Sequence, residues 1–247
     1  HTAKPFTPEQ AKELLLNLNQ PSVFNHMVSD WPALEWKLTY LSDILKDKQL
    51  RFRIGKKKLE TDPQFETHCD YISGTLQQFQ GWIRGDSPDL VGAFRDYDPS
   101  EYWAYADYKY LAVVFKDRED LLQGVKWSDF GFDGRDGKES TLWIGSSGAN
   151  TPCHVDTYGC NVVLQVEGRK TWHLFPPEDT PCMFPTRRPY EESSIFSKVN
   201  VMNQMATVSF IYQDQPTRGD FTARPGAVCP PTLVAFRTMR RASHSVR

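Results

Sequence analysis

Hydrophobic residues recur at helical spacing in the first part of the chain. Thr7 to Gln10 place a capping threonine, a proline and a glutamine ahead of a run of leucines, which predicts a helix that starts at Pro8. Thr75 to Gln78 repeat this start ahead of Phe79, and that helix would bury Leu76, Phe79, Trp82 and Ile83. The alternation in residues 51–54 predicts a strand between the two helices.

From Thr141 onward the hydrophobic period changes to two, as in the strands of a sheet. The alternating apolar residues are Leu142, Ile144, Val162, Leu164, Val166, Trp172 and Leu174. Glu167 to Arg169 supply a turn between two of these runs. Pro176 and Pro177 end the sheet region, because proline cannot donate to a β-ladder.

The segment 204–247 differs in composition from the rest, with six Arg against two Asp, no Lys and four Pro. Only Met205 to Tyr212 alternate weakly there, so we expect much of this segment to be mobile, including 217–224 and 237–247. We therefore predict a mainly β fold with flanking helices in three parts. These parts are an α/β portion at 1–140, the central strands at 141–203 and a divergent basic tail at 204–247.

Composition limits the classes of function. The 247 residues are 39% hydrophobic and 24% charged, with a net charge of -2, so no overall field attracts nucleic acid or an anionic membrane. No run approaches the roughly 18 apolar residues of a membrane span. Five cysteines without CxxC spacing indicate a reducing compartment, and we expect a cytoplasmic protein.

The strongest chemical signal is the sequence Thr151-Pro-Cys-His154-Val-Asp156. Residues two apart on a strand share a face, so His154 and Asp156 could offer one imidazole and one carboxylate to a single ion. With a second His, such a pair forms the facial triad of non-haem Fe(II) oxygenases. The alternative is a His and an Asp in a surface turn.

Lys170 strengthens the metal interpretation. It lies in register with Trp172 and Leu174, so its ammonium group could point into the same interior and hold the distal carboxylate of an acidic cosubstrate. Asn161 and Thr151 would add uncharged hydrogen-bonding groups. A buried Lys without an acidic partner would be costly, which favours such a cosubstrate.

Several stretches share their order and spacing with one known family, over about Pro5 to Asn203. They are Trp127-Ser-Asp-Phe-Gly-Phe, Leu142-Trp-Ile-Gly, Thr151 to Asp156, Asn161, and Gly168 to Asp179. The chain thereby resembles the JmjC-domain oxygenases of the asparaginyl-hydroxylase (factor-inhibiting-HIF) type. The resemblance implies a double-stranded β-helix, the jelly-roll or cupin-like fold.

The resemblance also implies a site. His154 and Asp156 would bind Fe(II), while Thr151 and Lys170 would bind 2-oxoglutarate and Asn161 would line the same pocket. The family adds an aromatic or neighbouring side chain from an earlier strand, for which Trp103 and Tyr105 are both candidates. The implied partner is a small heat-shock protein, in the cellular stress response.

The sequence departs from the family at the second His ligand. In the family, that His follows a Pro-Gly-x-Val-x-x-x-Pro segment. Here residues 225–231 begin similarly, but Arg237 stands at the position where the His is expected. We treat the Pro-Gly match as chance. We expect His173 to face away from Lys170, and His244 lies in the basic tail. The remaining histidines, outside the matched sheet, are His1, His26 and His68.

Two consequences follow from this departure. The β-helix should be incomplete at its C-terminal strands, and an open sheet edge would favour self-association unless residues such as 205–212 cover it. The function favoured is a weakly active or inactive binding or regulatory protein that associates with a small heat-shock protein. The alternative is an active 2-oxoglutarate-dependent dioxygenase that hydroxylates a protein. Action on RNA is less favoured, since only Lys56 to Lys58 and Arg187-Arg188 form basic clusters.

Overall fold

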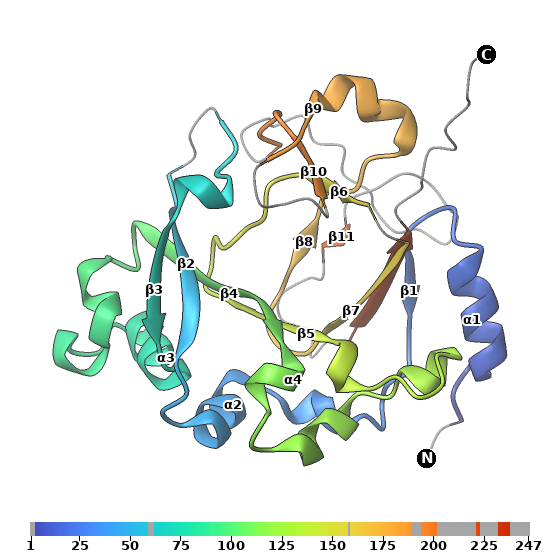
Figure 1. The fold of residues 1–247 in the computed structure, drawn as a ribbon, viewed down its shortest axis with the longest axis horizontal. Helices are drawn as coiled ribbons and strands as arrows, with labels where there is room; N and C mark the ends of the chain where they lie inside the picture. The colour runs from blue at the N-terminus through green and yellow to red at the C-terminus, as the bar shows by residue number, and fades with distance from the viewer. Residues whose placement is uncertain are drawn as a thin grey trace. The chain divides into compact units, whose positions relative to one another are not determined.

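The structure, a computed structural model, describes residues 3–58, 62–157, 159–188, 194–201, 221–222 and 232–237 (Figure 1). The chain divides into two units: unit 1 comprises residues 1–28, 61–63 and 152–247, and unit 2 comprises residues 29–60 and 64–151. The three parts expected from the sequence were divided by composition, whereas the two units are divided by spatial contacts. The three-part division therefore stays a prediction.

Unit 2 contains a four-stranded antiparallel sheet in the order β3-β2-β4-β5 (Figure 1). The strands are β2 (Leu50–Lys56), β3 (Asp70–Gly74), β4 (Tyr102–Tyr110) and β5 (Thr141–Gly145). The predicted strand at 51–54 lies inside β2. Phe52 and Ile54 are buried on one face of β2, whereas Arg53 points to the other face, opposite Tyr71 and Tyr105.

The apolar face of this sheet packs on helices. The helices and 3₁₀ turns of unit 2 are η1 (Pro32–Glu35), α2 (Leu38–Leu45), η2 (Glu66–His68), α3 (Leu76–Arg84), η3 (Pro88–Leu90), η4 (Gly92–Asp96), α4 (Leu111–Val114), η5 (Glu119–Gly124), η6 (Trp127–Phe130) and η7 (Gly137–Glu139). The ring of Phe52 stacks on Phe79 of α3 at 4.9 Å and meets Phe94 of η4 edge-on at 5.1 Å. These aromatic contacts form one part of the core of unit 2.

The predicted start of α3 is confirmed. Thr75 Oγ1 accepts a hydrogen bond from the Gln78 backbone N–H at 3.1 Å, and the Thr75 N–H donates to the Gln78 side chain at 2.9 Å. Phe79 and Trp82 are buried as expected, but Ile83 is 44% exposed. The prediction for Ile83 is wrong. Position 83 shares the face of Leu76 and Phe79, but it lies in the last turn of α3, which ends at Arg84.

Unit 1 contains one α-helix and three small antiparallel sheets among its described residues. The elements are α1 (Pro8–Leu16), β1 (Ser22–Phe24), β6 (His154–Asp156), β7 (Cys160–Gln165), β8 (Thr171–Trp172), η8 (Pro177–Met183), β9 (Pro185–Thr186), β10 (Ser194–Ser197), β11 (Phe221–Thr222) and β12 (Thr232–Arg237). The sheet orders are β1-β12-β7, β6-β10-β9 and β11-β8 (Figure 1). The capping box predicted at Thr7 is present at the start of α1.

The tail contributes strands where we expected mobile chain. Thr232–Arg237 pair with β7 on one side and with β1 on the other, so a segment of the tail itself covers one edge of β7. Phe221–Thr222 likewise pair with β8. The expectation fails at these positions because Thr-Leu-Val-Ala-Phe-Arg is a short β-prone run, which the basic, proline-containing composition around it obscured.

Other expectations for the tail lie outside the described residues: the alternating run 205–212, the segment 225–231 and His244. None of the helices among the described residues combines the length and the hydrophobicity that a membrane span requires. The described elements form antiparallel sheets with flanking helices, in keeping with the coarse fold class expected from the sequence.

Candidate metal site

His154 and Asp156 lie at the two ends of β6 and turn their side chains toward each other. His154 Nε2 is 3.5 Å from Asp156 Oδ1, and the side chains are 29% and 15% exposed. Both residues pair with β10, with Phe196 opposite His154 and Ser194 opposite Asp156. The strand period of two therefore brings one nitrogen and one carboxylate oxygen to the same partly exposed point.

The imidazole of His154 is held from its other side. His154 Nδ1 lies 2.8 Å from the carbonyl oxygen of Pro152. A carbonyl can only accept, so the hydrogen bond requires the proton on Nδ1, and in a neutral imidazole the lone pair is then on Nε2. The ring of Phe196 lies 5.3 Å from the imidazole and limits its rotation. This is the arrangement that orients a metal-binding histidine.

The carboxylate of Asp156 is held through both oxygens. Asn161 of β7 donates through Nδ2 to Oδ2 at 2.9 Å, and Ser194 of β10 donates through Oγ to Oδ1 at 3.2 Å. The resemblance implied that Asn161 lines a cosubstrate pocket, and the structure places its amide on the candidate ligand. The sequence reasoning missed Ser194, because nothing local links residues 38 apart.

The pair fits a divalent transition metal. Two ligands about 2.1 Å from one ion and at right angles to each other are about 3.0 Å apart, and the observed separation is 3.5 Å. Among the described residues, no group of three or more His, Cys, Asp or Glu side chains is placed to hold a metal ion. Arg237, at the offset of the family's second His, pairs through its backbone with Cys160, next to Asn161.

Lys170 lies on the face that the alternation predicted. Residues 170, 172 and 174 are half-buried, whereas 171, 173 and 175 are exposed, so His173 faces the other way as expected. Lys170 Nζ lies 4.4 Å from the centre of the Trp172 ring, within the range of a cation–π contact. The assignment of Lys170 to a carboxylate of 2-oxoglutarate stays a prediction.

The remaining candidates, Thr151, Trp103 and Tyr105, belong to unit 2. Trp103 is fully buried, and its indole N–H donates to the Lys56 carbonyl at 3.1 Å. Its side chain has no other polar atom that could contact a ligand. Tyr105 is 5% exposed, and burial raises the pKa of its hydroxyl. Of the two aromatic candidates, Tyr105 is the one whose side chain carries a group that can both donate and accept.

A buried ion pair lies on the same face of the unit 2 sheet as Tyr105, and the sequence reasoning did not single it out. Arg53 is fully buried; its Nε lies 2.8 Å from Asp107 Oδ2, and its Nη2 donates to the Asn150 carbonyl at 3.0 Å. Lys109 Nζ lies 4.0 Å from Asp107 Oδ1, and burial lowers the pKa of Lys109. In the sequence, Arg53 is only a polar position of an alternating strand.

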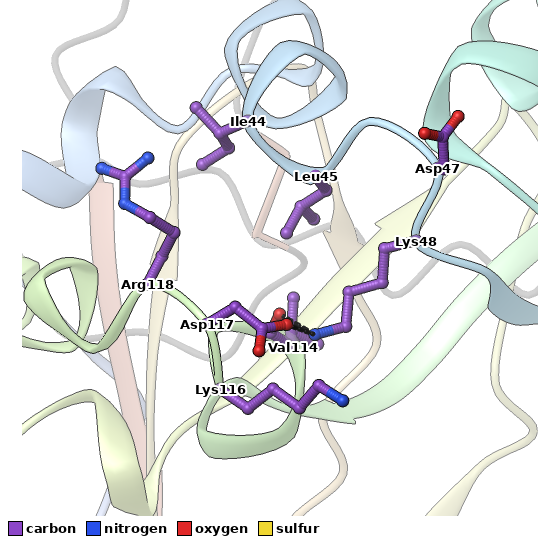
Figure 2. A pocket seen from close by; sticks show the side chains of 8 residues that line it. All are labelled: Ile44, Leu45, Asp47, Lys48, Val114, Lys116, Asp117 and Arg118. Carbon is purple, nitrogen blue, oxygen red and sulfur yellow. Dashed lines mark hydrogen bonds and ion pairs between the residues drawn. The ribbon is translucent and has the colours of Figure 1, made fainter.

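Unit 2 also has a pocket of about 330 Å³ between the end of α2 and the chain that follows α4. Its lining residues are Ile44, Leu45, Asp47, Lys48, Val114, Lys116, Asp117 and Arg118. Figure 2 shows Lys48 reaching across it toward Val114 and Asp117. None of the candidate site residues lines this pocket, and Lys48 ties α4 to the end of α2 through two backbone carbonyls.

The comparisons with known proteins agree with the motifs. Residues 8–232 match the cupin-like domain, and the chain belongs to that family. It is 62% identical over 200 residues to HSPB1-associated protein 1 of Bos taurus and of Homo sapiens, across 81% of this chain and 41% of each relative. It is also 24% identical over 185 residues to Lysine-specific demethylase 8 of Danio rerio, across 72% of this chain and 40% of that protein.

These relatives confirm the resemblance to the JmjC group. Within that group, the motifs also resemble those of the 27-kDa heat-shock-protein-associated protein 1, and the 62% identical relatives carry the corresponding name. The chain spans about two-fifths of the length of the relatives it matches, 41% for the mammalian proteins.

Proposed function

We propose that this chain is a JmjC-type cupin protein that binds a divalent metal weakly through His154 and Asp156. It then serves as a binding or regulatory protein with little oxygenase turnover. The observation that carries the proposal is the 3.5 Å approach of His154 Nε2, in a ring whose Nδ1 lies against the Pro152 carbonyl, to an Asp156 carboxylate that is fixed at both oxygens.

The expectation of low turnover rests on the sequence. Arg237 stands at the offset where the resemblance implies a second His, and a guanidinium group offers no lone pair to a metal. Loss of a partner that only orients a ligand costs about 10- to 100-fold in metal affinity or activity. Loss of a ligand itself should cost at least as much.

We infer a double-stranded β-helix as the detailed fold, with its C-terminal strands altered from the family pattern. The antiparallel pairs β6-β10, β7-β12 and β8-β11 support this arrangement. In it, Lys170 would hold the far carboxylate of 2-oxoglutarate, with Asn161 as a further contact. Thr151 and Tyr105 belong to unit 2, and their roles stay predictions from the resemblance. Fe(II), when bound together with 2-oxoglutarate, supplies the oxidising chemistry of such sites.

The proposed partner is a small heat-shock protein. Support comes from the name HSPB1-associated protein 1 that the 62% identical relatives carry. We expect this chain to co-elute with HSPB1 in size-exclusion chromatography, and separate elution at micromolar concentrations of both proteins would contradict the partner assignment.

The second candidate is an active 2-oxoglutarate-dependent hydroxylase of a protein substrate. The tautomer of His154 and the double hold on Asp156 favour it, because both features orient metal ligands. The two candidates differ in succinate release, which accompanies turnover of 2-oxoglutarate.

The test is a titration of the chain with Mn(II) and 2-oxoglutarate, combined with succinate release in the presence of Fe(II). We expect weak Mn(II) binding that His154→Ala removes, and succinate release no faster than in the Asp156→Ala variant. Succinate release well above that of the variant would establish the second candidate instead.

Lys170→Ala tests the cosubstrate pocket. Removal of the ammonium group should abolish the affinity for 2-oxoglutarate, because the far carboxylate loses its counter-charge. Thr171→Ala, at the adjacent exposed position, is the matched control and should leave the affinity unchanged. Equal 2-oxoglutarate affinities in the wild type and Lys170→Ala would remove the assignment of Lys170.

A further inference from the structure

We propose that Ser194 is a positioning residue that fixes the carboxylate of Asp156 for metal binding. The inference rests on the proposed function and adds a residue that neither the sequence motifs nor the relatives assign. Ser194 lies on β10, directly opposite Asp156, and its Oγ donates to Oδ1 at 3.2 Å.

The oxygen that Ser194 contacts is the one that would bind the metal. Oδ1 of Asp156 lies 3.5 Å from His154 Nε2, whereas Oδ2 accepts from Asn161 at 2.9 Å. The two donors therefore act on different oxygens of one carboxylate. Ser194 donates to the oxygen on the imidazole side, and Asn161 donates to the other oxygen.

This division matters because the terminal torsion of an Asp side chain is broad and roughly two-fold. One donor alone leaves the carboxylate free to tilt about the oxygen it holds. Two donors from two different strands, β7 and β10, stop that rotation and keep Oδ1 directed at Nε2. A metal then meets a preformed pair of ligands and does not have to order one of them.

The same strand supports the other ligand. Phe196, two residues after Ser194, lies opposite His154, and the two rings are 5.3 Å apart. Residues two apart on a strand share a face. β10 therefore presents a hydroxyl to the carboxylate and an aromatic ring to the imidazole, so it positions both members of the pair.

Ser194→Ala should weaken Mn(II) binding by about 10-fold, the lower end of the range for partners of metal ligands, since Asn161 still holds the other oxygen. Ser194→Thr keeps a hydroxyl and should restore most of the affinity. If Ser194 were purely structural, Ser194→Thr would recover metal affinity only to the extent that it recovers thermal stability.

Ser197 provides the matched control on the same strand. It is 3% exposed, and its Oγ donates to the Met183 carbonyl at 2.6 Å and accepts from the Val199 N–H at 2.9 Å. Ser197→Ala should lower the melting temperature and leave the Mn(II) affinity unchanged. This contrast separates loss of stability from loss of carboxylate positioning.

A second measurement tests the contact without metal. In urea unfolding of the metal-free protein, we compare Ser194→Ala, Asp156→Ala and the double variant. If the hydroxyl acts through the carboxylate, the double variant should unfold at the same urea midpoint as Asp156→Ala. Midpoint shifts that simply add would overturn the proposal.

The outcomes separate the two levels of inference. Coupled unfolding together with the 10-fold loss and the threonine rescue supports positioning. Coupled unfolding with unchanged Mn(II) affinity in Ser194→Ala reduces Ser194 to a structural contact and overturns the proposal. If the wild-type chain fails to bind Mn(II) at millimolar concentration, the proposed function is wrong, and the positioning role of Ser194 is wrong with it. Additive unfolding would overturn only the proposed contact between Ser194 and Asp156.

Discussion

The buried ion pair of Arg53 and Asp107 gives the sharpest test of the energetics of unit 2. Asp107→Ala removes the carboxylate that lies 2.8 Å from Arg53 Nε. Among the described residues, no other carboxylate is in ion-pair contact with this guanidinium. Arg53 is fully buried and Asp107 is 8% exposed, so the pair is largely shielded from water. The substitution therefore leaves a buried charge without compensation.

The expected size follows from that geometry. Breaking a buried ion pair by removal of one partner costs about 3–5 kcal/mol, a large part of the roughly 5–15 kcal/mol that stabilises a typical domain. The hydrogen bond from Arg53 Nη2 to the Asn150 carbonyl remains at 3.0 Å and satisfies one donor. We therefore expect a loss near the lower end, about 3 kcal/mol.

The assay is urea unfolding followed by circular dichroism, with Asp120→Ala as the control. Asp120 pairs with Arg118 at the same 2.8 Å distance, but the two side chains are 62% and 46% exposed. Water screens that pair, so the control should unfold with the wild type. Asp107→Asn, which keeps an acceptor, should fall between wild type and Asp107→Ala. A loss below about 1 kcal/mol in Asp107→Ala would refute the reasoning.

Three further predictions concern packing, capping and pH. Gly55→Ala should destabilise by about 1–3 kcal/mol in thermal unfolding, because its Cβ would lie 2.1 Å from the Trp103 ring; Gly159→Ala, with open space around it, is the control and should be near neutral. Thr75→Ala should cost about 1 kcal/mol in urea unfolding by loss of the α3 cap, while Thr75→Ser should not. Burial raises the pKa of Tyr71 to about 12, so the unfolded chain loses this proton first and stability should fall as the pH rises from about 10 toward 12. Alkaline unfolding followed by tyrosinate absorbance should begin at higher pH in Tyr71→Phe, and an unchanged onset would contradict the assignment.

Local signals in the sequence predicted local structure well. The capping boxes at Thr7 and Thr75 depend on residues three apart, so the sequence contains both partners of each hydrogen bond. The face of Lys170 follows in the same way from the alternation with Trp172. Such features need no knowledge of what the segment packs against.

Features that depend on distant pairing could not be predicted. Ser194 contacts Asp156 across 38 residues, and the buried state of Arg53 depends on Asp107 and Asn150, of which Asn150 is 97 residues away. The strand at 232–237 was missed because its role comes from β1 and β7, which lie far from it in sequence. For Ser194 and Arg53 the physical cause is a tertiary contact that leaves no local pattern, whereas the β-prone run at 232–237 was obscured by the basic, proline-containing composition around it.

The central claim is that His154 and Asp156 of one strand hold a single divalent metal ion with one imidazole nitrogen. Pulsed electron paramagnetic resonance of the Mn(II)-loaded chain counts directly coordinated nitrogens. The account predicts a coupling from one histidine nitrogen that disappears in His154→Ala and persists in His173→Ala. A coupling that survives in His154→Ala, or a spectrum of the wild type without nitrogen coupling, would contradict the account.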